Sequence, residues 1–76
     1  MNHSSPQMSL ELTRACGILK VPLHQLSRRT VVKRYRVLAL QYHPDRPGTD
    51  KAEQTRRFQE INEAYGVVMA HIDAGG

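Results

Sequence analysis

The sequence is poor in cysteine and in aromatic residues, and it has no long apolar run. Cys16 is the one cysteine among 76 residues, so no intramolecular disulfide can form, and we expect a reducing intracellular compartment, the cytoplasm. Aromatic residues make up 5% of the chain and tryptophan is absent, which argues mildly against stacking on single-stranded nucleic acid. No apolar run approaches the roughly 18 residues of a membrane span. The sequence therefore predicts neither a disulfide scaffold nor a membrane segment.

The chain also lacks the motifs of cofactor and metal sites. No glycine-rich phosphate loop is present, and His3, His24 and His71 are scattered without the spacing of metal ligands. A chain of 76 residues suffices for one small domain, but it is too short for a second core or a large catalytic pocket. We therefore predict no metal, no cofactor and no enzymatic activity, and we expect a monomer.

The positive charge of the chain is concentrated in one segment. Lysine and arginine together number 11, against 7 aspartates and glutamates, so the net charge is +4. Residues 28–42 contain no acidic residue and the following basic ones: Arg28, Arg29, Lys33, Arg34 and Arg36. Such a concentration favours an anionic partner surface, whether protein, nucleic acid or phospholipid head groups.

Apolar residues at helical spacing predict two helices in the first half of the chain. The first should run over about 9–19, with Ser9 as a good N-cap residue. The second should run over about 27–42 from Ser27 as N-cap, and Pro44 should end it because proline disfavours helical geometry at the preceding residue. The positions expected to face the core are Leu12, Ala15, Cys16, Leu19, Val31, Tyr35, Leu38 and Tyr42.

A third helix is predicted over about 50–70. Asp50 and Glu53 resemble a capping box at its start, and Glu53 and Arg57 have the i, i+4 spacing of an ion pair. Its core positions should be Phe58, Ile61, Tyr65 and Val68.

These elements predict an all-α fold. Two long amphipathic helices joined by a short loop should pack as an antiparallel hairpin, and the first helix should cover its apolar edge. We expect the domain to span residues 9–70, with flexible tails at 1–8 and 71–76.

A basic ridge is expected on the second helix, opposite its apolar stripe. Arg29, Lys33 and Arg36 follow i, i+4, i+7 spacing, and Leu40 continues the same line. An ordinary solvated face would explain such a ridge. However, arginines in the first helical turn oppose the helix dipole, which indicates another use.

The segment from Tyr35 to Arg46 reads Tyr-Arg-Val-Leu-Ala-Leu-Gln-Tyr-His-Pro-Asp-Arg, and Phe58, Ile61 and Ala64-Tyr65 follow it. This combination closely resembles the J domain of DnaJ-type co-chaperones. In that family a basic helix leads into His-Pro-Asp, and a later helix carries Phe-x-x-Ile-x-x-Ala-Tyr. His-Pro-Asp alone would be read as a helix stop and turn, so the surrounding residues carry the match, which covers residues from about 9 to 68.

The resemblance implies that the domain docks on a DnaK-type heat-shock chaperone and stimulates its ATP hydrolysis, with the nucleotide chemistry done by that partner. The basic helix would meet an acidic surface of the chaperone, and Asp45 would engage charged groups near the junction of its nucleotide-binding and substrate-binding domains. With Arg29 added from the ridge, the expected partner-binding residues are Arg29, Lys33, Tyr35, Arg36, His43, Pro44, Asp45 and Arg46. Packing alone would explain Tyr35 equally well.

Two features depart from the family pattern. Val32 and Val37 stand where many members have basic residues, and nearby arginines could compensate for them or redirect the ridge. In Ile-Leu-Lys-Val-Pro, Lys20 stands where the family has the glycine that ends the first helix. We favour this register over an alternative in which Gly17 ends the helix.

Two other functions remain open. One is a small basic helical module that binds nucleic acid, although the low aromatic content makes nucleic acid the less expected partner. The other is a degenerate J-like docking domain that binds a chaperone without stimulating it. No glycine/phenylalanine-rich or cysteine-rich module of the larger co-chaperones occurs in the sequence, as expected either for a short protein or for an excised domain.

Overall fold

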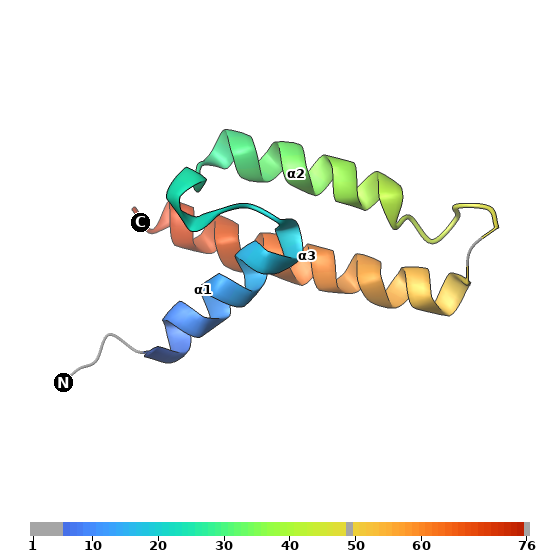
Figure 1. The fold of residues 1–76 in the computed structure, drawn as a ribbon, viewed down its shortest axis with the longest axis horizontal. Coiled ribbons are helices and arrows are strands. Elements are labelled where there is room, and N and C mark those ends of the chain that lie inside the picture. Colours follow the sequence, from blue (N-terminus) through green and yellow to red (C-terminus); the bar gives the residue numbers. More distant parts are fainter. Residues whose placement is uncertain (1–5, 49, 76) are drawn as a thin grey trace.

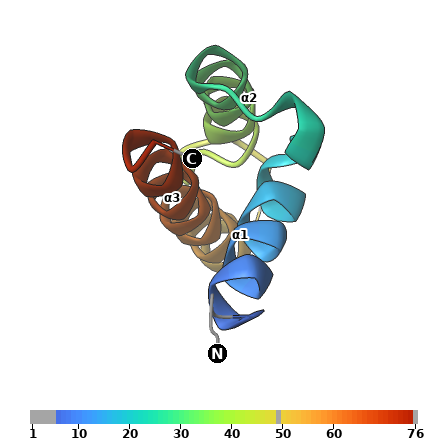
Figure 2. The same cartoon turned by 90° about the vertical axis from the view of Figure 1, so that its left-hand side faces the viewer.

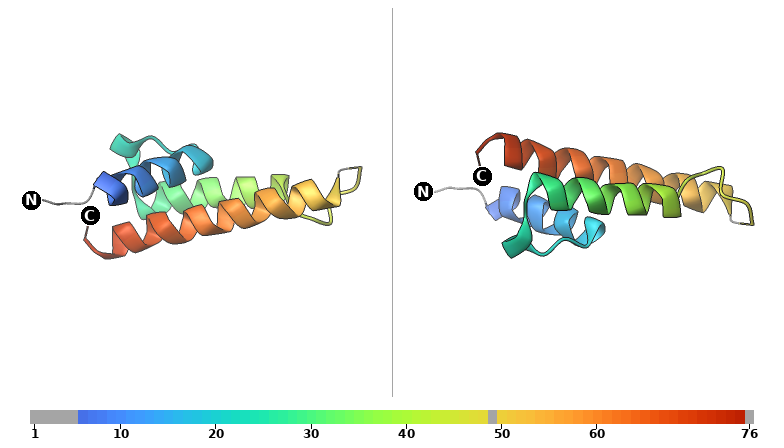
Figure 3. Two further views of the ribbon diagram at one scale, coloured as in Figure 1. Left: turned by 90° about the horizontal axis from the view of Figure 1, so that it is seen from below. Right: turned by 90° about the horizontal axis from the view of Figure 1, so that it is seen from above.

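The computed structural model describes residues 6–48 and 50–75, which form three α-helices and one short 3₁₀ helix (Figure 1). The elements are α1 (Pro6–Leu19), η1 (Leu23–Gln25), α2 (Arg28–Gln41) and α3 (Lys51–Asp73), and the described residues contain no strand. Helices α2 and α3 lie antiparallel, and α1 packs across them (Figures 1 and 3). The expected all-α fold with an antiparallel hairpin is therefore confirmed.

Both predicted N-cap residues of the hairpin are confirmed, but the capping box predicted from Asp50 and Glu53 is incomplete. Within the described residues, the Glu53 carboxylate bonds Arg56 and Arg57 and does not accept the Asp50 N–H. The Ser27 hydroxyl accepts the backbone N–H of Thr30 at 3.2 Å, and the Asp50 carboxylate accepts those of Ala52 and Glu53 at 3.0 and 3.3 Å. Each cap satisfies amide groups that have no partner inside the helix.

The first turns of α3 also contain the predicted ion pair. Arg57 lies 3.0 Å from the Glu53 carboxylate. Arg56 pairs with the same carboxylate at 2.7 Å and with Glu60 at 3.3 Å. Hydrogen bonds from Arg56 and Arg57 hold the pKa of Glu53 below its ordinary value.

Two helix ends differ from the prediction. Helix α1 begins at Pro6 rather than after Ser9, so Ser9 lies inside the helix. Proline suits the first helical position because it has no N–H, and an N–H at that position would have no partner within the helix. Helix α3 continues to Asp73 rather than ending near 70, because Ile72 still packs against the core. The helices thus enter both segments predicted as tails, while residues 1–5 and 76 lie outside the described residues.

Helix α1 ends at the residue that we favoured. Lys20 follows it with a φ of 60°, the left-handed conformation that usually selects glycine. The Lys20 N–H donates to the carbonyl of Gly17 at 3.3 Å, and the Val21 N–H donates to that of Cys16 at 3.0 Å. These two bonds form a Schellman motif. Gly17 therefore lies within the helix, and the alternative register is wrong.

The core collects apolar side chains from all three helices, as the periodicity predicts. Its fully buried members are Leu19, Val31 and Val68. The other buried apolar residues are Ala15, Cys16, Val21, Leu38, Ile61 and Ala64. Cys16 is a small buried apolar residue, and its burial raises the pKa of the thiol. Leu12, Tyr35, Tyr42 and Tyr65 are partly buried against this core.

Polar contacts fix how the helices sit on one another. At one end of the hairpin, the Arg28 guanidinium pairs with the Asp73 carboxylate and joins the start of α2 to the end of α3. Between α2 and α1, Arg34 Nε donates to the Leu19 carbonyl at 3.3 Å. The end-on view shows α2 and α1 on different sides of α3 (Figure 2). The outer face of α2 is therefore left uncovered within the described structure.

Candidate functional site on helix α2 and the following turn

The His-Pro-Asp sequence forms a closed turn directly after α2. The helix ends with the Tyr42 N–H donating to the Leu38 carbonyl at 2.9 Å. The Arg46 N–H then donates to the His43 carbonyl at 3.1 Å, which closes a four-residue turn. Pro44 occupies its second position, where the fixed φ of proline fits. Residue 49 of the predicted loop lies outside the described residues.

A buried glutamine of α3 braces this turn. Gln54 is 7% exposed and is the buried polar residue of the described core. Its side-chain amide donates to the carbonyls of Gln41 and His43, each at 3.3 Å. It thereby ties the end of α2 and the start of the turn to α3.

The supporting role of Gln54 was not predicted from the sequence, although its position on α3 indicates it. Gln54 precedes Phe58 by four residues and Ile61 by seven, so it occupies the apolar stripe of α3. A polar side chain on such a stripe needs a hydrogen-bond partner, and the carbonyls at a helix end supply one.

His43 is held by contacts on two sides. Its ring meets that of Phe58 edge-on, with the centroids 5.7 Å apart. Its Nδ1 accepts the backbone N–H of Asp45 at 3.2 Å. The prediction that Phe58 is a core residue is wrong. Phe58 is only partly buried, and its ring packs against His43 in the turn rather than in the hydrophobic core.

Asp45 presents its carboxylate outward from the braced turn. The side chain is 79% exposed, and its Oδ2 lies 4.0 Å from His43 Nδ1. Within the described part of the chain this carboxylate accepts no hydrogen bond. The turn thus restrains the backbone at Asp45 while its charge stays accessible.

The basic ridge is exposed on α2. Arg29, Lys33 and Arg36 are solvent-exposed, and no hydrogen bond or ion pair within residues 6–48 and 50–75 engages them. They border a shallow depression that also includes Val32 and Val37. Helix α2 therefore offers three cations that are available to an anionic partner.

The other two arginines of α2 do not simply extend the ridge. Arg28 pairs with Asp73, and Arg34 donates to the end of α1. Apolar surface takes part of the space instead, since Val37 is 47% exposed and Leu40 is 73% exposed. The surface leading to the turn is thus both basic and apolar.

Tyr35 joins α2 to α3. Its ring stacks on that of Tyr65 with the centroids 4.2 Å apart, and its hydroxyl donates to Asn62 Oδ1 at 2.6 Å. These contacts give Tyr35 a packing role and leave only part of its side chain to face a partner.

Metal binding and membrane insertion were the other two features judged from the sequence. Within residues 6–48 and 50–75, no three histidine, cysteine or acidic side chains come together as a metal site. None of the helices in this part of the chain combines the length and the apolar character needed to cross a bilayer.

The chain is similar to known proteins over most of its length. A family model described as the DnaJ domain matches residues 16–71. The chain belongs to the DnaJ domain family. The match includes the α2 ridge, the His-Pro-Asp turn and Gln54, so the resemblance found in the sequence is confirmed. No solved structure matches the chain significantly.

Several curated DnaJ proteins are similar to this DnaJ domain. The chaperone protein DnaJ of Helicobacter pylori (strain ATCC 700392 / 26695) is 53% identical over 51 residues, which cover 67% of this chain and 13% of that protein. Human DnaJ homolog subfamily B member 3 is 45% identical over 51 residues, which cover 67% of this chain and 34% of that protein. The chain thus spans about a third or less of these relatives. Together with the family match they support a J-domain co-chaperone.

Proposed function

We propose that this DnaJ domain binds a DnaK-type heat-shock chaperone and stimulates its ATP hydrolysis, and that it does so as a monomer in the reducing cytoplasm. Arg29, Lys33 and Arg36 make the first contact, with Tyr35 beside them. The docking group is the turn that contains His43, Pro44, Asp45 and Arg46. The observation that carries the proposal is the exposed Asp45 carboxylate on a turn braced from α3.

Long-range attraction accounts for the first step. Exposed cations on one face raise the rate of encounter with an acidic surface, and salt weakens that attraction. Because Arg29, Lys33 and Arg36 form no ion pair within the described residues, no internal bond has to break before they meet the partner.

Restraint of the turn accounts for the second step. Gln54 and the closed His43–Arg46 turn fix the backbone around Asp45, so little conformational entropy remains to be lost when the carboxylate forms a charge-assisted bond. Stimulation further requires tighter binding to one conformation of the chaperone than to the other, because equal affinity shifts no equilibrium.

A single-turnover ATPase assay with Asp45→Asn tests the mechanism. We expect the wild-type chain to accelerate hydrolysis by a DnaK-type chaperone and Asp45→Asn to lose most of that acceleration, because the amide keeps the shape and removes the charge. Glu63→Gln is the matched control, since it removes one exposed carboxylate from α3 and should stimulate like the wild type. Equal stimulation by Asp45→Asn and the wild type would refute the mechanism.

The two alternatives predict other results. A nucleic-acid-binding module should bind DNA or RNA with a steep salt dependence, be insensitive to Asp45→Asn and be weakened by Arg29→Ala. A docking domain without stimulation should bind the chaperone and leave its hydrolysis rate unchanged.

A further inference from the structure

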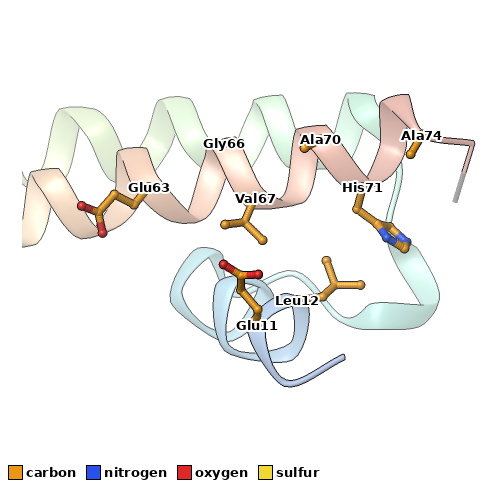
Figure 4. Close-up of a pocket in the computed structure, with 8 residues that line it drawn as sticks. All are labelled: Glu11, Leu12, Glu63, Gly66, Val67, Ala70, His71 and Ala74. Atoms are coloured by element: carbon orange, nitrogen blue, oxygen red, sulfur yellow. The ribbon is translucent and has the colours of Figure 1, made fainter. Parts of the chain in front are cut away.

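A trough runs along the seam between α1 and α3, on a different side of the molecule from the exposed face of α2 (Figures 2 and 4). It consists of two hollows of about 730 and 380 Å³. Both hollows are lined by Glu11, Glu63 and Val67, which therefore mark the middle of what we call the α1–α3 trough. The function proposed above involves α2 and the His-Pro-Asp turn and assigns no role to this trough.

The trough has the size and surface of a helix-binding groove. Along α3 and its C-cap residue it extends from Glu60 to Ala74, about 21 Å at the helical rise per residue. Leu12 and Val67 supply apolar surface between the two helices (Figure 4). Along α3, Gly66 and Ala70 are small and exposed, and a Cβ added at Gly66 would meet no atom within 4 Å. An approaching helix can therefore come close to α3.

The two side chains that carry charge at the middle of the trough are carboxylates. Glu11 and Glu63 are exposed and form no ion pair within the described residues. Figure 4 shows the Glu11 carboxylate between α1 and α3, near Val67. The other charged or titratable groups along the trough lie to either side of this middle. Arg14 and Glu60 line the smaller hollow, and Glu60 is paired with Arg56. His71 lines the larger hollow.

We propose that the α1–α3 trough binds an amphipathic helix of a partner protein, one with a narrow apolar stripe flanked by lysine or arginine. The apolar stripe packs on Leu12 and Val67, and the basic side chains reach Glu11 and Glu63. Helix-in-groove recognition combines these two kinds of contact. A second copy of this chain is disfavoured as occupant, because each copy carries a net charge of +4.

The trough acts independently of the surface proposed for the chaperone. Its residues belong to α1 and α3, whereas the ridge belongs to α2, which runs behind α3 in Figure 4. One domain can therefore hold a basic helix in the trough while its α2 face and turn engage a chaperone. Failure of either proposal leaves the other standing.

An NMR titration of the full chain tests the trough. The probe is a helical peptide of alanine and leucine with lysines flanking its apolar stripe, and the control peptide has glutamate in place of lysine. We expect the lysine peptide to shift the amide signals of Leu12, Val67 and Ala70, and the glutamate peptide to leave them in place. Unchanged spectra at millimolar peptide, equal shifts with both peptides, or shifts confined to α2 would overturn the proposal.

Paired variants separate specific contacts from net charge. Glu11→Gln with Glu63→Gln should weaken binding of the lysine peptide about fivefold. Gln25→Lys with Gln59→Lys changes the net charge equally at exposed positions that do not line the trough, and it should have little effect. Equal weakening by both pairs would overturn the proposal. Concentration-dependent self-association in sedimentation would also overturn the proposal, because it would show that a second copy of the chain fills the trough.

Discussion

Single residues decide how firmly the turn and the helix ends are held. Lys20 is the clearest case, because it adopts a left-handed φ of 60° without being glycine. A side chain in that conformation places its Cβ close to the following carbonyl oxygen, at a cost of about 1–2 kcal/mol. The Schellman bonds at the end of α1 hold it there.

Lys20→Gly should therefore stabilise the domain. Relief of the strain outweighs the extra freedom that glycine gives the unfolded chain, and we expect a net gain of about 0.5 kcal/mol. Lys33→Gly is the matched control within α2, where glycine should cost about 1 kcal/mol. Urea unfolding of both variants measures the difference. A loss of stability in Lys20→Gly would contradict the strain.

Gln54 carries a second prediction at this scale. Gln54→Leu keeps the approximate size of the side chain and removes both donors to the carbonyls of Gln41 and His43. We expect a loss of about 1 kcal/mol in the free energy of unfolding. We also expect stimulation of the chaperone ATPase to fall severalfold, because the turn is less restrained.

Gln59→Leu provides the control for this change. Gln59 lies on α3 but is exposed, so its replacement should alter neither stability nor stimulation appreciably. A folded Gln54→Leu variant that stimulates as well as the wild type would show that the brace is unnecessary.

Whole elements were largely predictable from the sequence, and their ends were less so. The stripe containing Val31 and Leu38 and the caps Ser27 and Asp50 depend on neighbours within a few residues, which a sequence displays directly. The extension of α3 to Asp73 depends on the packing of Ile72 and on the contact with Arg28. Such contacts join residues far apart in the chain, so helical periodicity alone does not reveal them.

The candidate site was predictable to a similar degree. Its exposed residues followed from the spacing of Arg29, Lys33 and Arg36 and from the family motif. The contacts that support the turn could not be predicted in this way. The hydrogen bond from Gln54 and the contact between Phe58 and His43 arise only when α2 and α3 pack together. Likewise, only the folded chain shows that Arg28 and Arg34 are engaged elsewhere.

The whole molecule is an elongated body of 49 × 24 × 17 Å. Its His-Pro-Asp turn lies at one end, and the start of α1 and the end of α3 lie toward the other (Figure 1). Charge is distributed unevenly over it, with free cations on α2 and free carboxylates along the α1–α3 trough. Its orientation toward a charged partner should therefore depend on where the charges lie and not only on their sum.

Association kinetics test this dependence on location. Lys33→Gln with Arg36→Gln should slow association with a DnaK-type chaperone severalfold at low salt and reduce the dependence of the rate on salt. Arg56→Gln with Arg57→Gln removes the same net charge from α3, where both arginines already pair with Glu53. Stopped-flow association at two salt concentrations compares the pairs, and equal slowing in both would show that only the total charge matters.

The brace from Gln54 also sets a condition for protein engineering. If the tetrapeptide His-Pro-Asp-Arg is grafted onto the end of an unrelated helix, the exposed groups are transferred. The Gln54 amide, which donates to two backbone carbonyls from the opposite helix, is left behind. The smallest portable unit is therefore the tetrapeptide together with the first two turns of the opposing helix.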